Sequence, residues 1–351
     1  DNTLLSDIIE TQRVITRHII QRRELVMQVE DLRVLFLAKF APNEGENYPL
    51  VTEVSDGIYA QYHYDIYQIL KKICPKTVCG HDVNVLFENK NSYDYVFTLL
   101  NRAPYRNSEI FVSALLEYLD IPYLGARPNI RALAEDKHLA KMAAKYAGLN
   151  TPEWITIDFD ASISANKPFP GPYFVKPRFG ASSAFIDENS IATSWEDARK
   201  RIIILQEQGI DVIVEKFIDG IFYSVPIYFK DSTIIHLPAI KEKSTLKGNV
   251  VTYRQKRKLD SGLTRTVNPD RDLENKLTYL SDSFIELIKP IDYTRIDFMV
   301  TPKTVEFIEF NVCCNLGCQS AFCISANSVG ISQADLVTQI LKSSLKRQKV
   351  I

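Results

Sequence analysis

Four polar residues near the end of the chain have side chains suited to metal-assisted chemistry: Arg295, Asp297, Glu309 and Asn311. Two carboxylates and an amide form an all-oxygen ligand set, which suits Mg2+ carried by a nucleotide better than zinc or copper. Arg295 beside them would stabilise an anionic transition state. These groups meet only if the chain between them folds back on itself.

The stretch from 294 to 320 predicts that fold-back as a β-hairpin. Residues 295–300 and 305–311 each alternate polar with apolar side chains, and residues 301–303, Thr-Pro-Lys, supply the turn. Because alternate side chains of a strand share a face, each polar pair lies together. An ordinary hairpin with a solvated polar face has the same alternation, so the rest of the chain must decide.

A second set of residues is suited to phosphate. Lys176 ends a predicted strand and is followed by Gly-Ala-Ser-Ser at 180–183, and Lys137 lies on the preceding helix. A loop of small residues brings backbone N–H groups against phosphates while lysines neutralise their charge. The alternative for a lone strand lysine is a solvated edge position.

Composition and charge limit the class of function. The 351 residues are 46% hydrophobic and 24% charged, which is typical of a soluble globular protein with two or three subdomains. Lys plus Arg (42) against Asp plus Glu (43) gives a net charge of −1, which does not favour binding of nucleic acid or membranes. The sequence has no apolar run of ~18 residues and no signal-peptide order at its start. Six cysteines form no disulfide framework, so we expect a cytoplasmic protein with reduced thiols.

Several familiar motifs are absent. There is no G-x-G-x-x-G after the first strand, no P-loop, no H-E-x-x-H and no G-x-S-x-G. Cys313, Cys314, Cys318 and Cys323 have irregular spacing and no nearby histidine, so we interpret them as free thiols in a pocket wall rather than as a metal site. The basic stretch 241–265 is interpreted as a mobile lid over a polyphosphate, because few aromatic residues interleave with its charges.

The remaining pattern predicts an α/β and α+β protein. Strands alternate with helices over 31–126, which indicates a small parallel α/β domain. We predict strands at 32–40, 83–87, 95–100 and 233–240, and a β-rich segment from 154 to about 228 that includes strands at 173–177 and 212–218. We predict helices at 3–29, 53–72, 107–119, 131–147, 194–207 and 272–288, and a carboxyl-terminal helix capped by Ser332 and Asp335. In the helix at 131–147, one face would carry Leu133, Leu139, Met142, Ala143 and Tyr146.

The order of these pieces resembles the ATP-grasp superfamily and, within it, the D-alanine–D-alanine ligase group. The resemblance covers about residues 32–345. It rests on Asp136-Lys137, Val-Lys176-Pro with Gly-Ala-Ser-Ser, Val212-Ile-Val-Glu215-Lys-Phe-Ile-Asp-Gly, Arg295-Ile-Asp297 and Glu309-Phe-Asn311. It implies an ATP-grasp fold behind a small parallel α/β domain, with an amino-terminal extension at 1–30, a substrate domain at 31–126, a central subdomain at 127–235 and a metal-binding subdomain at 236–351.

The resemblance also implies a reaction and its site. A carboxylate would attack the γ-phosphate of ATP to give an acyl phosphate, which an amine then converts to an amide, with two Mg2+ ions or Mn2+ as a substitute. The implied ATP-binding residues are Lys137, Lys176, Ser182, Ser183, Glu215, Lys216, Phe217, Ile218 and Lys256. The implied metal ligands are Asp297, Glu309 and Asn311, and the implied catalytic residues are Arg295, Ser182 and Lys256. The implied substrate-binding residues are Glu53, Asn101, Glu109, Gly317 and Ser320.

Departures from the family pattern cluster on the acceptor side. The family's His-Gly stretch is replaced by Asn101 to Glu109, so Glu109 is expected to take over an acidic role, and Phe222 stands where the family has an acid for the ribose. We therefore expect an ATP- and Mg2+-dependent carboxylate–amine ligase acting on small amino-acid-like substrates, with a homodimer as an open option. The alternatives are D-alanine–D-alanine ligase activity itself and a catalytically silent nucleotide-binding module.

Overall fold

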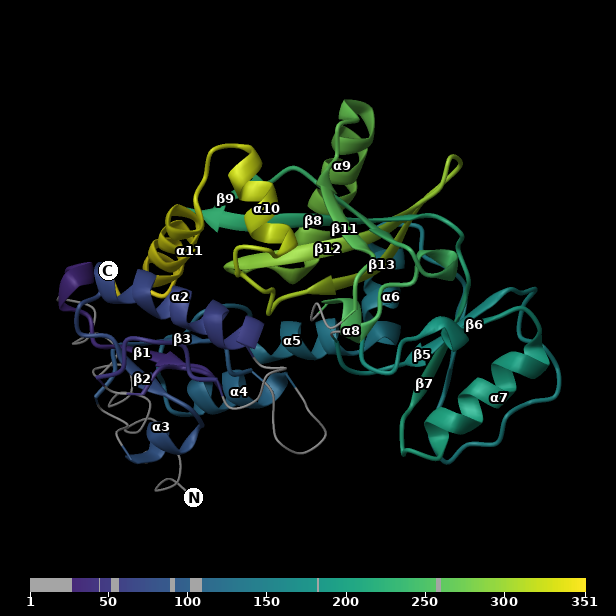
Figure 1. Ribbon diagram of the computed structural model, residues 1–351, viewed down its shortest axis with the longest axis horizontal. Coiled ribbons are helices and arrows are strands. Elements are labelled where there is room, and N and C mark those ends of the chain that lie inside the picture. The colour runs from purple at the N-terminus through teal and green to yellow at the C-terminus, as the bar shows by residue number, and fades with distance from the viewer. Residues whose placement is uncertain are drawn as a thin grey trace, which may run out of the picture.

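The structure is a computed structural model in which these segments of the chain are described: 27–43, 45–51, 57–88, 92–101, 109–181, 183–256 and 260–351. Within them the strands form three sheets, spread along the long axis of the molecule in Figure 1. One sheet is parallel with helices on both faces and two are antiparallel, so the α/β and α+β prediction is confirmed. No helix in the described segments is long and apolar enough to cross a membrane.

The parallel sheet follows from short apolar runs that are buried on both faces. Its order is β2-β1-β3, and every residue of β1 and β3 is buried. One face packs on α2 and on the carboxyl-terminal helix α11, and the other packs on α3 and α4. The bounds are β1 (Val34–Leu37), β2 (Val78–Gly80), β3 (Tyr95–Thr98), α2 (Gly57–Ile73), α3 (Asn84–Glu88), α4 (Ile110–Tyr118) and α11 (Gln333–Arg347). The expected helix at 3–29 lies outside the described residues up to residue 26.

The prediction of a strand at 83–87 is wrong, because these residues form α3. Asp82 accepts a hydrogen bond from the backbone N–H of Asn84 at 2.7 Å, which starts the helix. Leu86 is fully buried in the cluster that covers this face of the sheet. A run of four or five residues is too short for its period to distinguish a helix from a strand. The third strand of the sheet is β2 instead.

The smaller antiparallel sheet has the order β4-β7-β5-β6 and is covered on one face by α7. The helix predicted at 194–207 is confirmed as α7, and Ser194 caps it by accepting from the N–H of Asp197. Figure 1 shows this unit at the right-hand end of the molecule. The bounds are β4 (Trp154–Ile157), β5 (Tyr173–Pro177), β6 (Ile191–Ala192), β7 (Val212–Lys216), α7 (Trp195–Gln206) and the 3-10 helix η3 (Glu188–Ser190).

The larger antiparallel sheet has the order β11-β10-β8-β12-β13, with β9 also paired to β8. Helices α6 and α9 pack on one face, and α10 and α11 contact β8 and its neighbours. Ser332 caps α11 by accepting from the N–H of Asp335, as predicted. The bounds are β8 (Ile221–Lys230), β9 (Thr233–His236), β10 (Ile240–Ser244), β11 (Leu263–Val267), β12 (Tyr293–Val300), β13 (Val305–Asn311), α8 (Tyr253–Lys256), α9 (Arg271–Ile288), α10 (Ala321–Ser328), η1 (Val29–Asp31) and η4 (Lys247–Asn249).

The strand predicted at 233–240 is interrupted. β9 and β10 run along the same edge of β8, with residues 237–239 between them. Leu237 keeps one ladder contact through its N–H to the carbonyl of Pro226, but Pro238 has no N–H to donate. One long predicted strand therefore becomes two short ones, and β10 continues into the basic segment whose other arm is β11.

The helix predicted at 131–147 is two helices, α5 (Pro128–Glu135) and α6 (Lys137–Tyr146). Asp136 between them has an extended backbone, and its carboxylate accepts from the N–H of His138 at 2.9 Å. The side chain that starts α6 therefore also ends the continuous helix. The expected apolar face is also wrong: Leu139, Met142 and Tyr146 are exposed. The face of α6 that packs inward consists of Lys137, Ala140, Lys141 and Ala144.

Candidate active site

The β12–β13 hairpin places its four polar residues as predicted. Arg295 lies opposite Asn311 and Asp297 lies opposite Glu309 in the antiparallel register. The register shifts just after Asp297, where Ile308 is the extra residue of a bulge. The hairpin therefore brings two carboxylates, an amide and a guanidinium together, and we call these four residues the carboxylate cluster.

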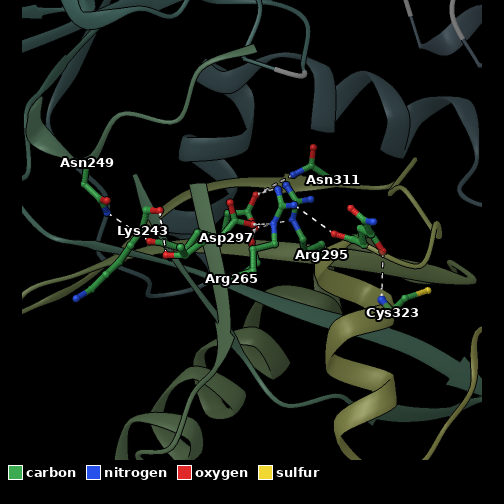
Figure 2. A network of polar contacts seen from close by, with 12 residues as sticks. Lys243, Asn249, Arg265, Arg295, Asp297, Asn311 and Cys323 are labelled. Carbon is green, nitrogen blue, oxygen red and sulfur yellow. Dashed lines mark hydrogen bonds and ion pairs between the residues drawn. The ribbon is translucent and has the colours of Figure 1, made fainter. Parts of the chain in front are cut away.

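Asp297 is the centre of this cluster (Figure 2). Arg295 donates to both of its carboxylate oxygens, at 2.8 and 2.6 Å. Ser224 on β8 donates to Oδ1 at 2.8 Å, and the amide nitrogen of Asn311 donates to Oδ2 at 3.0 Å. A carboxylate has about four lone-pair positions, so Asp297 is fully hydrogen-bonded within the protein.

The two carboxylates of the cluster differ in acidity. Asp297 is fully buried, and burial raises its pKa against the lowering effect of Arg295. Burial acts in the same direction on Glu309, but the positive charges of Lys137, Lys176 and Lys256 lower its pKa overall. Glu309 is therefore the carboxylate held ionised by its surroundings, while Asp297 depends on its partners.

The donor set of the cluster fits Mg2+. The carboxylates of Asp297 and Glu309 and the amide oxygen of Asn311 are hard oxygen ligands, and the phosphates of a nucleotide would supply others. Asn311 uses its nitrogen on Asp297, which leaves its oxygen for a cation. Across the described segments no group of three His, Cys, Asp or Glu residues could hold a metal ion by itself. For Asp297 to bind a metal, Arg295 must release at least one oxygen.

Helix α6 delivers two lysines from its inward face. Lys137 donates from Nζ to the carbonyl oxygen of Gly180 at 2.7 Å, at the start of the small-residue loop. Lys141, one turn later, is fully buried. In the loop, Ser183 has a left-handed backbone conformation with φ of 56°, and Ser182 lies outside the described residues. Lys137 thus lies where the sequence predicted a cation beside a phosphate-binding loop.

A second buried charge cluster joins helix α6 to strands β5 and β7. Glu215 on β7 is 3% exposed, with Oε2 at 2.9 Å from Nζ of Lys176 and Oε1 at 3.1 Å from Nζ of Lys141. Burial would raise the pKa of Glu215, but the two lysines lower it. Burial lowers the pKa of Lys141 to about 8, against the raising effect of Glu215. We call Lys141, Lys176 and Glu215 the lysine–glutamate triad.

A cavity of about 110 Å3 opens in front of this triad. Its walls are apolar, with Phe174, Phe217 and Met299 among them. The N–H groups of Lys216 and Phe217 are already donated to the carbonyls of Glu153 and Pro172, so among 216–218 a base would find the N–H of Ile218. The lining contains these predicted ATP-binding residues: Lys176, Ser183, Glu215, Lys216, Phe217, Ile218 and Lys256.

A larger cavity, of about 820 Å3, lies on the other side of the carboxylate cluster. Its lining brings together Asn101, Glu109, Gly317 and Ser320, all predicted to bind substrate, and Arg295. Asn101 accepts from Arg131 at 2.7 Å, and Ser320 caps α10 by accepting from the N–H of Cys323 at 3.1 Å. The predicted Glu53 lies outside the described residues.

The two cavities meet at the carboxylate cluster. Phe222, Glu242, Lys256 and Glu309 line both of them. Burial lowers the pKa of Lys256, while Glu309 opposes this shift. A phosphate group that extends out of the smaller cavity would therefore contact a substrate bound in the larger cavity. The contact would lie beside the carboxylate of Glu309 and the ammonium group of Lys256.

The six cysteines are free thiols, as predicted, and Cys313, Cys314 and Cys318 line the larger cavity. Burial raises the pKa of Cys314 beyond its usual range, so this thiol stays protonated. Cys313 accepts from the guanidinium of Arg131 at 2.8 Å. These contacts favour a role in shaping the cavity wall over nucleophilic chemistry.

Three residues that the sequence analysis did not single out belong to the site. Lys141 is one of several lysines on α6. It follows Lys137 by four residues, which places both side chains on the same face of the helix, and this spacing is the sequence signal that could have identified it. His63 on α2 lines the larger cavity; its Nδ1 accepts from the N–H of Phe40, and burial lowers its pKa to about 4, which leaves Nε2–H as a neutral donor. Glu242 lies within the basic stretch 241–265, and Nε of Arg265 donates to its carboxylate at 3.1 Å.

The sequence matches one family and many curated relatives. The family described as D-ala D-ala ligase C-terminus matches residues 138–342, which is more than half of the chain. D-alanine--D-alanine ligase B of Clostridium perfringens is 28% identical over 244 residues, covering 68% of this chain and 76% of that protein. D-alanine--D-alanine ligase of Clostridium botulinum is 26% identical over 241 residues, covering 68% of this chain and 77% of that protein.

Solved structures share the fold at lower identity. A D-alanine--D-alanine ligase from Bacillus anthracis complexed with ATP aligns with a TM-score of 0.69 and 20% identity, over 91% of this chain and 99% of that one. VanG D-Ala:D-Ser ligase from Enterococcus faecalis aligns with a TM-score of 0.65 and 15% identity, over 90% and 99%. These likenesses confirm the ATP-grasp fold that the sequence predicted.

Proposed function

The chain belongs to the D-ala D-ala ligase C-terminus family, and on that premise we propose how its two cavities carry out one ligation. The protein is an ADP-forming ATP-grasp ligase that forms an amide bond between amino-acid substrates at the expense of ATP. We propose that ATP occupies the smaller cavity and the loop at 180–183, and that the carboxylate and amine substrates occupy the larger one.

One observation carries this assignment: the two cavities meet at Glu309 and Lys256, beside Asp297 and Arg295. A ligase of this kind needs its nucleotide and its carboxylate substrate to be in contact at the γ-phosphate and separated elsewhere. The apolar walls of the smaller cavity suit a base, and the mixed charges of the larger cavity suit zwitterionic amino acids.

The reaction consists of two displacements. A carboxylate oxygen of the first substrate attacks the γ-phosphorus of ATP, the bond to the β,γ-bridging oxygen breaks, and ADP leaves. The amine of the second substrate then attacks the carbonyl carbon of the acyl phosphate, and the tetrahedral intermediate expels phosphate and loses a proton to give the amide. Excluding water from the acyl phosphate is required, because water competes with the amine.

The residues of the carboxylate cluster would have different parts in stabilising the negative charge that develops in these steps. Asp297, Glu309 and Asn311 would hold Mg2+, which neutralises the charge of the transferred phosphoryl group. Two ions, with Mn2+ as a substitute, are the expected arrangement. Lys137 and Lys176 place positive charge beside the phosphates, and Arg295 stabilises the oxyanion of the tetrahedral intermediate once it releases Asp297.

The substrates are small molecules, and we propose that one is an amino acid or an amino-acid-like carboxylate. Glu53 and Glu109 would hold an ammonium group, and Ser320 a carboxylate. D-alanine–D-alanine ligation is the second candidate, because the curated relatives carry that name. A cytoplasmic location, the absence of nucleic-acid and membrane partners, the option of a homodimer and the bounds of the four domains stay predictions.

The test is ADP release with Mg2+ and ATP across a panel of amino acids, offered singly and in pairs that include D-alanine, with products weighed by mass spectrometry. We expect a condensed product from one pair and no ADP release above background for Glu309→Ala. Glu286→Ala, which removes an exposed carboxylate of α9 that forms an ion pair with Lys289, is the control and should keep full activity. Unchanged turnover in folded Glu309→Ala would contradict the proposal.

A further inference from the structure

Lys141 is the most deeply buried cation beside the nucleotide cavity, and neither the metal site nor the phosphate contacts use it. Its side chain has no exposed surface, and Nζ donates to Oγ1 of Thr151 at 2.8 Å. Thr151 donates in turn to the carbonyl oxygen of Phe307 on β13, also at 2.8 Å. Because the hydroxyl hydrogen is used on that carbonyl, the lone pairs of Thr151 face Lys141. The ammonium group is therefore fixed between α6 and the metal-binding hairpin.

The other partner of Lys141 is Glu215, whose two oxygens are in different situations. Oε2 faces the ammonium of Lys176 at 2.9 Å. Oε1 lies 3.1 Å from Lys141 but accepts no well-formed hydrogen bond from the described residues, although it is buried. A buried carboxylate oxygen without a donor is costly unless a ligand supplies one. Glu215 lines the smaller cavity, so a molecule bound there lies beside this carboxylate.

We propose that Lys141 is a positioning residue for the nucleotide base: it orients Glu215 so that Oε1 accepts a hydrogen bond from the 6-amino group of adenine. The inference rests on the proposed function, since it requires ATP in the smaller cavity. It assigns to Lys141 a part in choosing ATP over nucleotides such as ITP, in which a carbonyl oxygen replaces the amino group.

The geometry favours this role over that of a purely structural ion pair. A buried lysine–carboxylate pair contributes little stability on balance, because desolvation offsets most of the attraction. One lysine, Lys176, would already compensate the single charge of Glu215. The second lysine instead fixes the carboxylate from the opposite side, so that the group cannot rotate away from the base. We therefore expect loss of Lys141 to change the preference for ATP over ITP more than it changes the stability of the fold.

Helix α6 offers a matched pair of lysines for the test. Lys141 and Lys145 are one turn apart, and their ammonium groups lie 5.5 and 4.6 Å from the centre of the same Trp154 ring. Lys145 is exposed and lines neither cavity. Lys141→Met and Lys145→Met therefore remove the same charge from the same helix, once behind the base and once in solvent. Methionine keeps the unbranched stem of lysine in the buried position.

The experiment is calorimetric titration of the full chain with ATP and with ITP in the presence of Mg2+. We expect Lys141→Met to weaken ATP binding about tenfold, the size of one hydrogen bond to a charged group, and to change ITP binding less than about threefold. Lys145→Met should match the wild type for both nucleotides. An equal loss for ATP and ITP in Lys141→Met, or an unchanged preference for ATP, would overturn the inference.

Two further variants keep the test decisive. If Lys141 acts through Glu215, adding Lys141→Met to Glu215→Gln changes the ATP to ITP ratio no further, whereas independent effects would multiply. If Lys141→Met does not fold, Thr151→Val, which removes the hydroxyl that fixes Nζ, should lower the ratio in the same direction; an unchanged ratio would overturn the inference. Wild-type protein that binds no ATP overturns the proposed function, whereas wild-type binding with an unaltered variant overturns this inference alone.

Discussion

Two buried charge clusters contribute side chains to the smaller cavity, and they are built in opposite ways. The lysine–glutamate triad has two cations around one carboxylate, and its members come from α6, β5 and β7. The carboxylate cluster has two carboxylates and one cation, and all its members come from the β12–β13 hairpin. One cluster therefore has an excess of positive charge and the other an excess of negative charge.

The difference shows in which cluster the protein itself keeps the buried carboxylate ionised. In the triad, the lysines lower the pKa of Glu215 despite its burial, so the protein itself keeps the carboxylate ionised. In the carboxylate cluster, burial raises the pKa of Asp297 even with Arg295 in contact. The lysines of the triad compensate the charge of its carboxylate within the protein, whereas the carboxylate cluster uses Arg295 in the place where a metal cation would balance its charge.

The largest effect on activity is expected from removing one charge of the carboxylate cluster. Asp297→Asn keeps the shape of the side chain but loses a metal ligand, so turnover should fall about 1000-fold at any Mg2+ concentration that saturates the wild type. ADP release measured over a range of Mg2+ concentrations checks this. Asp272→Asn, on the exposed surface of α9, is the control. Full activity of Asp297→Asn would show that the cluster is not the metal site.

A smaller effect, on stability, is expected from removing the only carboxylate of the triad. Glu215→Gln removes the carboxylate that forms ion pairs with the buried Lys141 and Lys176, and the free energy of unfolding should fall by about 3 kcal/mol. Urea denaturation measures this change. Glu286→Gln breaks an exposed pair with Lys289 at 2.7 Å and should change stability by less than about 0.5 kcal/mol. Equal effects of the two substitutions would contradict the contrast between buried and exposed pairs.

The smallest expected effect is a pH dependence of ATP affinity that differs in sign from the pH dependence of stability. Lys141 has a pKa of about 8, below its ordinary value of 10.5, and faces Glu215 on β7, Lys176 on β5 and Glu306 on β13. As pH rises through about 8, the ammonium loses its proton and its hold on Glu215, so ATP affinity should fall several-fold.

Stability should change with the opposite sign over the same interval. The unfolded chain binds this proton more tightly than the folded one, so stability from this group rises between pH 8 and 10.5. Calorimetric titration with ATP and melting curves at several pH values measure the two trends, and Lys141→Met should remove both. A parallel fall of ATP affinity and stability would instead indicate alkaline unfolding.

Elements with a clear period or cap could be predicted from the sequence. The hairpin at 294–311, the helix that Ser194 begins and the helix that Ser332 caps all lie where local pattern placed them. The pairs Arg295 with Asp297 and Glu309 with Asn311 followed from alternation, because a strand has a fixed period of two. Residues 83–87 were too few to show any period, and Asp82 decided for a helix.

The sequence by itself determined the hairpin with its oxygen-bearing side chains and the order of the segments that we propose to bind phosphate. It also showed where the chain differs from the family pattern, at 101–109 and at Phe222. Only the tertiary structure decided that Asp136 breaks one helix into two, and that α6 turns Lys137 and Lys141 inward while Leu139 and Met142 face solvent. A helix shows the same 3.6-residue period whichever face is buried, so its orientation depends on what packs against it. Here strands β5 and β7, which follow α6 in the chain, bring Lys176 and Glu215 to its inward face. The ion pair with Glu215 compensates the cost of burying the charge of Lys141.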